Sequence, residues 1–291
     1  MKKNKIALFI GIVAELGKVK ITVAVSLSTI LGYILWKGTA DASMWLPTLG
    51  IFLLAMASSA INHYQERDYD ALMDRTRLRP IPSGRISPGG ALAVALALAV
   101  AGSALLWIDS GFLAMQLGLL ALLWYNAIYT PLKRVTPFAV VPGSVIGAIP
   151  PMVGWVAAGG WLMDPKILMV AFFFFIWQIP HFWLLLLKLG PQYAQAGFPV
   201  LTNLYSNRQL RNITFVWTLT MAISCLFIPV FGGMHTNVGR LLLLVGSVAL
   251  VLLFVRLLLL KDDQVYDKRY FLYINTYLLV VMVVLAADAV A

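Results

Sequence analysis

Nine stretches of this chain are apolar enough and long enough to cross a lipid bilayer as helices, and no other feature constrains the fold as strongly. A spanning helix needs roughly 20 mostly apolar residues. Hydrophobic residues make up 61% of the 291 residues and charged residues only 12%, and the mean hydropathy is +0.86. This composition argues against a water-soluble globule. The stretches are 21–36, 46–63, 90–108, 111–129, 138–158, 167–187, 213–231, 241–260 and 270–290.

The sequence therefore predicts an all-α fold, a polytopic membrane protein with nine transmembrane helices in a single domain, 1–291. The odd number depends on one turn signal. Asp109, Ser110 and Gly111 interrupt a long apolar tract, and such a cluster favours two helices over one overlong helix.

The distribution of positive charge sets the expected orientation. Lys and Arg prefer loops that stay in the cytoplasm. If the N-terminus lies inside, all but three of the 22 Lys and Arg residues fall in inner segments, and the exceptions are Lys37, Lys166 and Arg240. We therefore expect a cytoplasmic N-terminus, an external C-terminus and a bacterial inner membrane. The net charge of +10 marks one membrane side on this interpretation, so we expect no nucleic-acid partner.

Two polar segments, 64–89 and 189–212, are expected to face the cytoplasm. The first contains part of a series of oxygen-bearing side chains, which we call the acidic series. Asn62, Glu66 and Asp70 are spaced four residues apart at the end of the second predicted helix. On an α-helix the three side chains drift only about 80° and share one face. Two carboxylates and an amide are hard oxygen ligands, and they suit Mg²⁺, which takes its remaining ligands from water and substrate phosphates.

Basic residues follow the acidic series. Arg75, Arg79 and Arg85 lie among prolines and a glycine and could clamp diphosphate oxygens. Lys133 and Lys188 come at the inner ends of the fourth and sixth predicted helices. The alternative for such a loop is a set of solvated charges that pair with one another. We favour a metal-diphosphate site because the series begins on a spanning helix, where polar side chains are costly.

At these residues the chain resembles a known family. The pattern Asn-x-x-x-Glu-x-x-x-Asp-x-x-Met-x-Arg-Thr-x-x-Arg-Pro at 62–80, followed by Ile-Pro-Ser-Gly-Arg-Ile-Ser, is similar to the first motif of the protohaem IX farnesyltransferase (haem O synthase) family, a branch of the UbiA superfamily of membrane prenyltransferases. The resemblance recurs at 15–33, 129–134 and 147–155, and in Trp-Gln-Ile-Pro-His-Phe at 177–182.

The resemblance implies a UbiA-type helical bundle that uses Mg²⁺ to transfer a farnesyl group from farnesyl diphosphate to a vinyl group of haem B, with addition of water. It implies the lipid bilayer, an isoprenoid diphosphate and haem as partners, and a downstream haem A synthase or terminal oxidase assembly. It also implies diphosphate contacts for Arg75, Arg79, Arg85, Lys133 and Lys188.

Three positions depart from the family pattern. Gln192 stands where the family usually has an aspartate, Lys18-Val19-Lys20 replaces Lys-Pro-Arg, and Thr202 replaces a proline. The amide at Gln192 could leave a second Mg²⁺ without a ligand, shift the balance toward Lys188 as the phosphate partner, or mark a paralogue with altered substrate or reduced activity.

The acceptor side of the site is expected on the fourth and sixth helices. We predict that His181 ligates or orients haem iron, because neutral imidazole is a common axial ligand. Gln178, Tyr129 and Asn126 lie at the same inner level. The alternatives are a histidine that only hydrogen-bonds a neighbouring helix, and an interfacial aromatic belt with a snorkelling Lys133.

Other functions remain open at this point. The nearest is a UbiA-type prenyltransferase that acts on an aromatic or quinone precursor. A transporter predicts charges deep inside several helices, whereas the ionisable residues here gather at one inner face. An inactive or haem-binding regulatory paralogue stays possible because of Gln192.

Overall fold

The structure is a computed structural model that describes residues 5–259 and 268–291, and its regular secondary structure is helical. Within these ranges there is no β-strand. In the described part of the chain, nine helical segments are long and apolar enough to span a membrane, as the sequence predicted. They are Val19–Lys37, Ala42–Gln65, Pro88–Ser110, Phe112–Leu132, Pro137–Ala157, Pro165–Gln195, Asn207–Phe227, Asn237–Leu258 and Lys268–Val290.

Six spans are single helices, and one of these six is unusually long. They are α2 (Val19–Lys37), α5 (Pro88–Ser110), α11 (Asn207–Phe227), α12 (Asn237–Leu258), α13 (Lys268–Val290) and the long one, α10 (Pro165–Gln195). α10 runs eight residues beyond the predicted end at 187, because Pro191 is accommodated inside the helix. The predicted stretch 241–260 ends at residue 260, which lies outside the described ranges. Lys2, Lys3 and Lys261, which were counted among the inner charges, also lie outside them.

The other three spans are assembled from shorter pieces. The second is η1 (Ala42–Met44) with α3 (Trp45–Gln65). The fourth joins α6 (Phe112–Leu123), the π-helical segment η2 (Trp124–Tyr129) and α7 (Thr130–Leu132). The fifth joins η3 (Pro137–Ala139), α8 (Val140–Gly143) and α9 (Val145–Ala157). Outside the spans lie α1 (Lys5–Leu16), α4 (Arg67–Asp70) and η4 (Leu201–Asn203).

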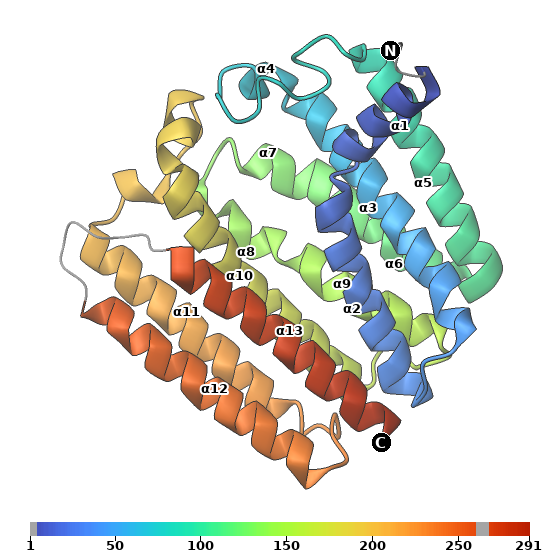
Figure 1. Cartoon of the computed structure of the whole chain (residues 1–291), viewed down its shortest axis with the longest axis vertical. Helices are drawn as coiled ribbons and strands as arrows, with labels where there is room; N and C mark the ends of the chain where they lie inside the picture. Colours follow the sequence, from blue (N-terminus) through green and yellow to red (C-terminus); the bar gives the residue numbers. More distant parts are fainter. Residues whose placement is uncertain (1–4, 260–267) are drawn as a thin grey trace.

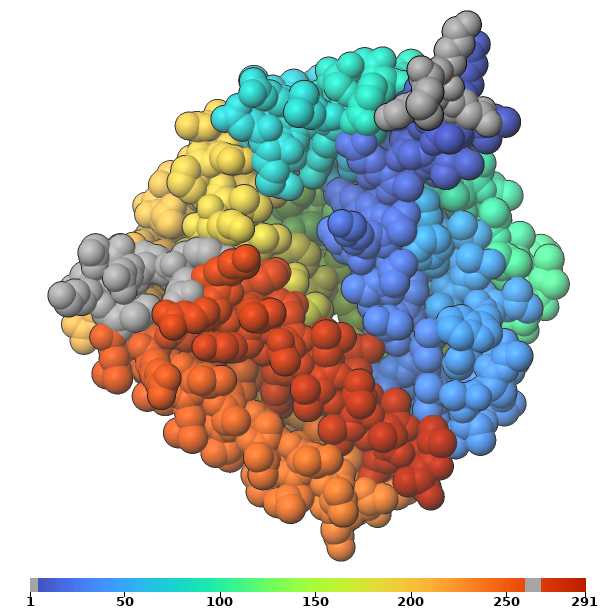
Figure 2. All heavy atoms as spheres, in the orientation of Figure 1, coloured from blue at the N-terminus to red at the C-terminus, as the bar shows by residue number. Residues whose placement is uncertain are grey.

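The spans form two groups with a hollow between them. In Figure 1, α2, α3, α5 and α6 lie on one side and α10 to α13 on the other. α9 contacts α2, α6 and α10, and α13 contacts α2, so these helices connect the groups. Figure 2 shows the molecular face hollowed between α2 and the pair α10 and α13, below the segment that follows α3. The beginning of α1 and the end of α13 lie at opposite ends of the bundle (Figure 1), as an odd number of spans requires.

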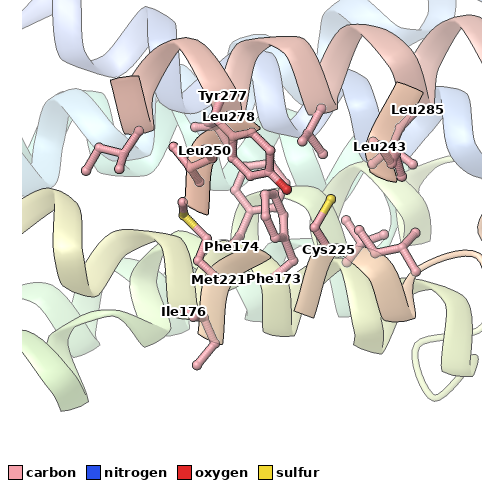
Figure 3. Close-up of a cluster of buried hydrophobic side chains, with 14 of the residues drawn as sticks. Phe173, Phe174, Ile176, Met221, Cys225, Leu243, Leu250, Tyr277, Leu278 and Leu285 are labelled. Carbon is pink, nitrogen blue, oxygen red and sulfur yellow. The ribbon is translucent and has the colours of Figure 1, made fainter. Parts of the chain in front are cut away.

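The largest buried apolar cluster fills the space between α10, α11, α12 and α13. Figure 3 shows Phe173, Met221, Cys225 and Tyr277 gathered in it. Cys225 is fully buried there, and Ser247 Oγ lies 2.7 Å from the Tyr277 hydroxyl oxygen. This packing holds the second group of helices together and fixes α10 and α13 beside each other.

Two glycines allow α2 and α9 to pack backbone to backbone. A Cβ at Gly32 would lie 1.9 Å from the Pro151 carbonyl oxygen, and a Cβ at Gly154 would lie 1.8 Å from the Thr29 carbonyl oxygen. Small residues at a crossing let helices approach closely in a membrane. The contact fixes α9 against α2 and so determines one wall of the hollow.

Candidate functional site

The acidic series keeps helical spacing although the helix that carries it is interrupted. α3 ends at Gln65, and Glu66 adopts φ −102° and ψ 7° before α4 begins. Backbone hydrogen bonds nevertheless run from Glu66 N to Asn62 O (2.9 Å) and from Asp70 N to Glu66 O (2.7 Å). Asn62, Glu66 and Asp70 are 1%, 7% and 1% exposed. The three oxygen-bearing side chains are therefore stacked at the C-terminal end of the second span and withdrawn from solvent.

Each member of the acidic series contacts a basic side chain from a different part of the chain. Lys18 Nζ donates to Asn62 Oδ1 at 3.2 Å, and Lys133 Nζ lies 2.5 Å from Glu66 Oε1. Arg79 Nη1 donates to both carboxylate oxygens of Asp70, at 2.8 and 2.7 Å. We call these six residues the charged cluster: Lys18, Asn62, Glu66, Asp70, Arg79 and Lys133.

The electrostatics of the cluster leave a surplus of positive charge. Burial opposes ionisation of both Glu66 and Lys133, but each holds the other charged: Lys133 lowers the pKa of Glu66, and Glu66 raises the pKa of Lys133. Burial, and then the nearby Arg79, lower the pKa of Lys18 to about 7. Three basic groups face two carboxylates, so a bound anion would stabilise the charged form of Lys18 and balance the cluster.

Lys18 is a member that sequence reasoning did not select. It lies between α1 and α2 with a left-handed backbone (φ 48°), a conformation that non-glycine residues rarely adopt and that often marks functional positions. Its partner Asn62 is 44 residues away in the chain. The signal available in the sequence was the lysine at the start of Lys18-Val19-Lys20, the position compared with the family's Lys-Pro-Arg.

The remaining predicted phosphate ligands lie outside the charged cluster. Arg85 donates to both carboxylate oxygens of Glu15, at 2.8 and 2.9 Å, and this pair is exposed. Arg75 and Lys188 are exposed as well. Of the five basic residues selected from the sequence, the structure brings Arg79 and Lys133 together with the acidic series.

The π-helical segment η2 anchors the fourth span to α3. Asn126 is buried, and its side-chain Oδ1 accepts from Ser58 Oγ at 2.9 Å. Its Nδ2 donates to Ser58 O and to Gln65 Oε1, while Gln65 Nε2 donates to Asn126 O. π-Helical turns inside α-helices occur frequently at functional sites. Here these hydrogen bonds fix η2, and with it Tyr129 at its last position, against α3.

Tyr129 lies between the charged cluster and α10. A Cβ at Gly143 would lie 2.4 Å from its ring, so α8 packs directly on that ring. Lys133 Nζ lies 5.2 Å from the centroid of the Tyr129 ring, and the Phe182 ring is 6.0 Å from it. Tyr129 and Lys133 also line a small pocket together with Tyr193.

The predicted acceptor residues on α10 have contrasting surroundings. Gln178 packs against Gly147 of α9, where a Cβ would lie 2.2 Å from Gln178 Oε1, and that oxygen is buried without a hydrogen bond from the protein. His181 Nδ1 lies 2.8 Å from Asn275 Oδ1 of α13. The His181 ring is 5.4 Å from Phe182, so ring contacts run from Lys133 through Tyr129 and Phe182 to His181.

Gln192 and His63 also carry buried polar atoms. Gln192 Oε1 is buried without a hydrogen-bond partner, and so are both ring nitrogens of His63. His63 is 1% exposed, one residue from Asn62, and the positive charges of Lys18 and Arg79 act on it.

Comparison with known proteins gives a consistent result. A model of the UbiA prenyltransferase family matches residues 25–278. A protein from Geobacter sulfurreducens named protoheme IX farnesyltransferase is 41% identical over 209 residues, which cover 72% of this chain and 77% of the relative. A protein of the same name from Nitratidesulfovibrio vulgaris is 35% identical over 280 residues, covering 96% and 95% of the two chains.

The fold has solved counterparts at low sequence identity. A UbiA homolog from Archaeoglobus fulgidus, solved with GPP and Mg²⁺ bound, matches with a TM-score of 0.72 at 13% identity, over 96% of this chain and 99% of that one. The two proteins therefore share an all-helical membrane fold.

Proposed function

This chain belongs to the UbiA prenyltransferase family, and from that premise we propose that it transfers a farnesyl group from farnesyl diphosphate to a vinyl group of protohaem IX. Family membership rests on the match over residues 25–278 and on relatives that align along nearly the whole chain, and it confirms the resemblance found in the sequence motifs. Water adds during the reaction, so the products are haem O and diphosphate.

The observation that carries the chemistry is the charged cluster at the C-terminal end of the second span. It combines two carboxylates and an amide with three basic side chains, all within hydrogen-bonding or ion-pair distance of a neighbour. A diphosphate leaving group needs positive charge on its oxygens as the carbon-oxygen bond breaks. The apolar helices that surround the hollow suit a long hydrocarbon chain.

The donor set of the cluster fits Mg²⁺. Asn62, Glu66 and Asp70 offer hard oxygen ligands on one helix face. No group of three or more Asp, Glu, His or Cys side chains suited to a metal occurs in the described part of the chain. Mg²⁺ usually binds through one or two carboxylates and substrate phosphates rather than in an all-protein cage. When bound, Mg²⁺ would neutralise charge on the departing diphosphate.

We assign the basic members of the cluster to the diphosphate. Arg79 offers several N–H donors in a planar fork, which suits phosphate oxygens, while Lys18 and Lys133 act as point charges. In the structure these side chains pair with Asn62, Glu66 and Asp70. Binding of diphosphate with Mg²⁺ would exchange the partners: the acidic series would turn to the metal and the basic residues to phosphate. Because the cluster carries surplus positive charge, the net negative charge of the incoming complex complements it.

The reaction then needs no protein nucleophile. The bond between the allylic carbon and the diphosphate oxygen breaks, and its electron pair leaves with diphosphate. The vinyl π electrons of haem form a bond to the farnesyl cation, which leaves a cation next to the porphyrin ring. Water captures that cation and loses a proton, giving a hydroxyethylfarnesyl group.

For the acceptor we propose His181 as the ligand or guide of haem iron, with Gln178 and Tyr129 beside it. The unpartnered Gln178 Oε1 can accept a hydrogen bond from substrate, and the Tyr129 ring lies in the run of contacts between the charged cluster and His181. Asn126 has its amide engaged by Ser58 and Gln65, so we propose that it supports the acceptor site by fixing η2.

We keep Arg75, Arg85 and Lys188 in the proposal only as outer residues that attract the anionic substrate. Because these side chains are exposed, they suit long-range electrostatic attraction of the substrate from solvent better than direct binding of the diphosphate oxygens. We further propose that this multi-pass protein lies in a bacterial inner membrane with a cytoplasmic N-terminus, and that its product passes to a haem A synthase or a terminal oxidase assembly.

The decisive experiment is to incubate membranes that contain the protein with farnesyl diphosphate, protohaem IX and Mg²⁺, and to identify the haem product by mass. We expect the mass of haem B plus one farnesyl group and one hydroxyl group. Membranes that carry the Asp70→Ala variant serve as the control. A farnesylated quinone or aromatic precursor, with haem left unchanged, would instead support the second UbiA-type activity.

A further inference from the structure

Asn275 on α13 is hydrogen-bonded to the His181 ring, across 94 residues of sequence. A polar side chain in the last span is costly in a membrane unless it has a partner. We infer that Asn275 is a positioning residue that fixes the tautomer of His181, so that the lone pair on Nε2 is free for haem iron. The inference rests on the proposed function, because it concerns how the same site receives its acceptor.

The orientation of the Asn275 amide is determined by a backbone carbonyl. Asn275 Nδ2 donates to the Phe271 carbonyl oxygen, one turn earlier on α13. A carbonyl oxygen can only accept, so the amide nitrogen must face it, and the reversed orientation would place two acceptors against each other. Asn275 Oδ1 is therefore the atom that faces His181.

The orientation of the amide decides which ring nitrogen of His181 carries the proton. Oδ1 can only accept, so His181 Nδ1 must donate across the 2.8 Å contact. A neutral imidazole has a single N–H group, and its other nitrogen then carries a lone pair. Among the described residues Nε2 makes no hydrogen bond, and it is not sealed in the interior as both ring nitrogens of His63 are.

Aromatic neighbours fix the plane of the ring. The His181 ring lies 4.7 Å from the Trp177 ring and 4.9 Å from the Phe271 ring, each tilted by 39°, while Phe182 meets it edge-on. Phe271 thus serves twice, since its ring contacts the imidazole and its carbonyl orients Asn275. When a histidine binds a metal through one ring nitrogen, the group that hydrogen-bonds its other ring nitrogen sets the tautomer, the ring orientation and the basicity of the ligand.

The test uses the full chain in lipid nanodiscs loaded with haem B. Three variants are compared with wild type: Asn275→Leu removes the acceptor, Asn275→Asp keeps an acceptor and adds charge, and Thr276→Val is the matched control, because Thr276 is exposed on the same helix. The readouts are the iron-histidine stretching band of the ferrous protein by resonance Raman spectroscopy, the Kd for haem, and separate KM values for haem and farnesyl diphosphate.

We expect Asn275→Leu to lower the frequency of the iron-histidine band and to weaken haem binding by roughly 10- to 100-fold, with the KM for haem raised and the KM for farnesyl diphosphate unchanged. Asn275→Asp should raise the band frequency, because a carboxylate is a stronger acceptor, and Thr276→Val should match wild type. A purely structural role would not shift the band in opposite directions.

The outcomes separate the two ideas. If the wild type makes haem O but all three variants share its band and its Kd, the inference about Asn275 is overturned and the proposed function stands. The inference is also overturned if His181→Ala keeps the iron-histidine band. A wild type that binds no haem and forms no haem product would overturn both.

Discussion

Replacing Asp70 by asparagine separates the catalytic role of its carboxylate from its structural role. The side chain is 1% exposed, and both oxygens accept from Arg79 Nη1, at 2.8 and 2.7 Å. Asparagine preserves the shape but removes the charge. Breaking a buried ion pair costs about 3–5 kcal/mol, and the Arg79 side chain is 16% exposed, so we expect destabilisation of about 3 kcal/mol, the lower end of the range.

The expected loss of activity is larger than the stability loss can explain. Removing one group that stabilises charge in the transition state typically costs about 10²- to 10³-fold in rate. We expect at least this decrease in kcat/KM for the Asp70→Asn variant, together with a weaker response to Mg²⁺. The assay is transfer of labelled farnesyl diphosphate to haem B by purified protein, with thermal unfolding measured on the same samples.

The double variant Asp70→Asn with Arg79→Met supplies the control. It removes the unpaired guanidinium, so stability should recover relative to Asp70→Asn alone, whereas activity should not. If the double variant regained wild-type activity, Asp70 would serve only to neutralise Arg79, and the assignment of Arg79 to the diphosphate would be wrong as well. Wild-type kcat/KM and an unchanged Mg²⁺ requirement in Asp70→Asn itself would refute the metal role.

Three further predictions concern other parts of the site. Chelation of divalent cations should abolish farnesyl transfer, and Mg²⁺ should restore it better than Ca²⁺, which prefers more ligands than this cluster offers; transfer that persists in excess chelator would contradict this. Gly147→Ala should push Gln178 aside and raise the KM for haem at a stability cost of about 1–3 kcal/mol, and an unchanged KM would mean that Gln178 does not contact the acceptor. Arg79→Ala should raise the KM for farnesyl diphosphate far more than Arg85→Ala, since the exposed pair of Arg85 with Glu15 is worth at most about 1 kcal/mol, and equal effects would contradict the assignment.

The parts of the fold that follow from local sequence were predictable. Hydropathy located all nine spans because each must bury its own backbone in lipid. The four-residue spacing placed Asn62, Glu66 and Asp70 together because their relative positions depend on one helix, and backbone hydrogen bonds preserve that spacing through the interruption at Glu66.

The parts that depend on tertiary contacts were not predictable in the same way. Lys18 reaches Asn62 across 44 residues, and Arg85 pairs with Glu15 across 70 residues, so neither partner is visible from local spacing. The π-helical turn at Trp124–Tyr129 gives no periodic signal, although it fixes how Asn126 engages Ser58 and Gln65. The end of α10 at Gln195 was misjudged because a proline usually ends a helix, whereas Pro191 lies within this one.

The most direct test of the central claim is a structure of the protein with a non-hydrolysable farnesyl diphosphate analogue and Mn²⁺, which replaces Mg²⁺ and is located by its anomalous signal. We predict an anomalous peak at about 2.0–2.2 Å from oxygens of Glu66 and Asp70, with Lys133 and Arg79 turned to the diphosphate. A peak elsewhere in the bundle, with the ion pairs of Glu66 and Asp70 intact beside a bound analogue, would contradict the account.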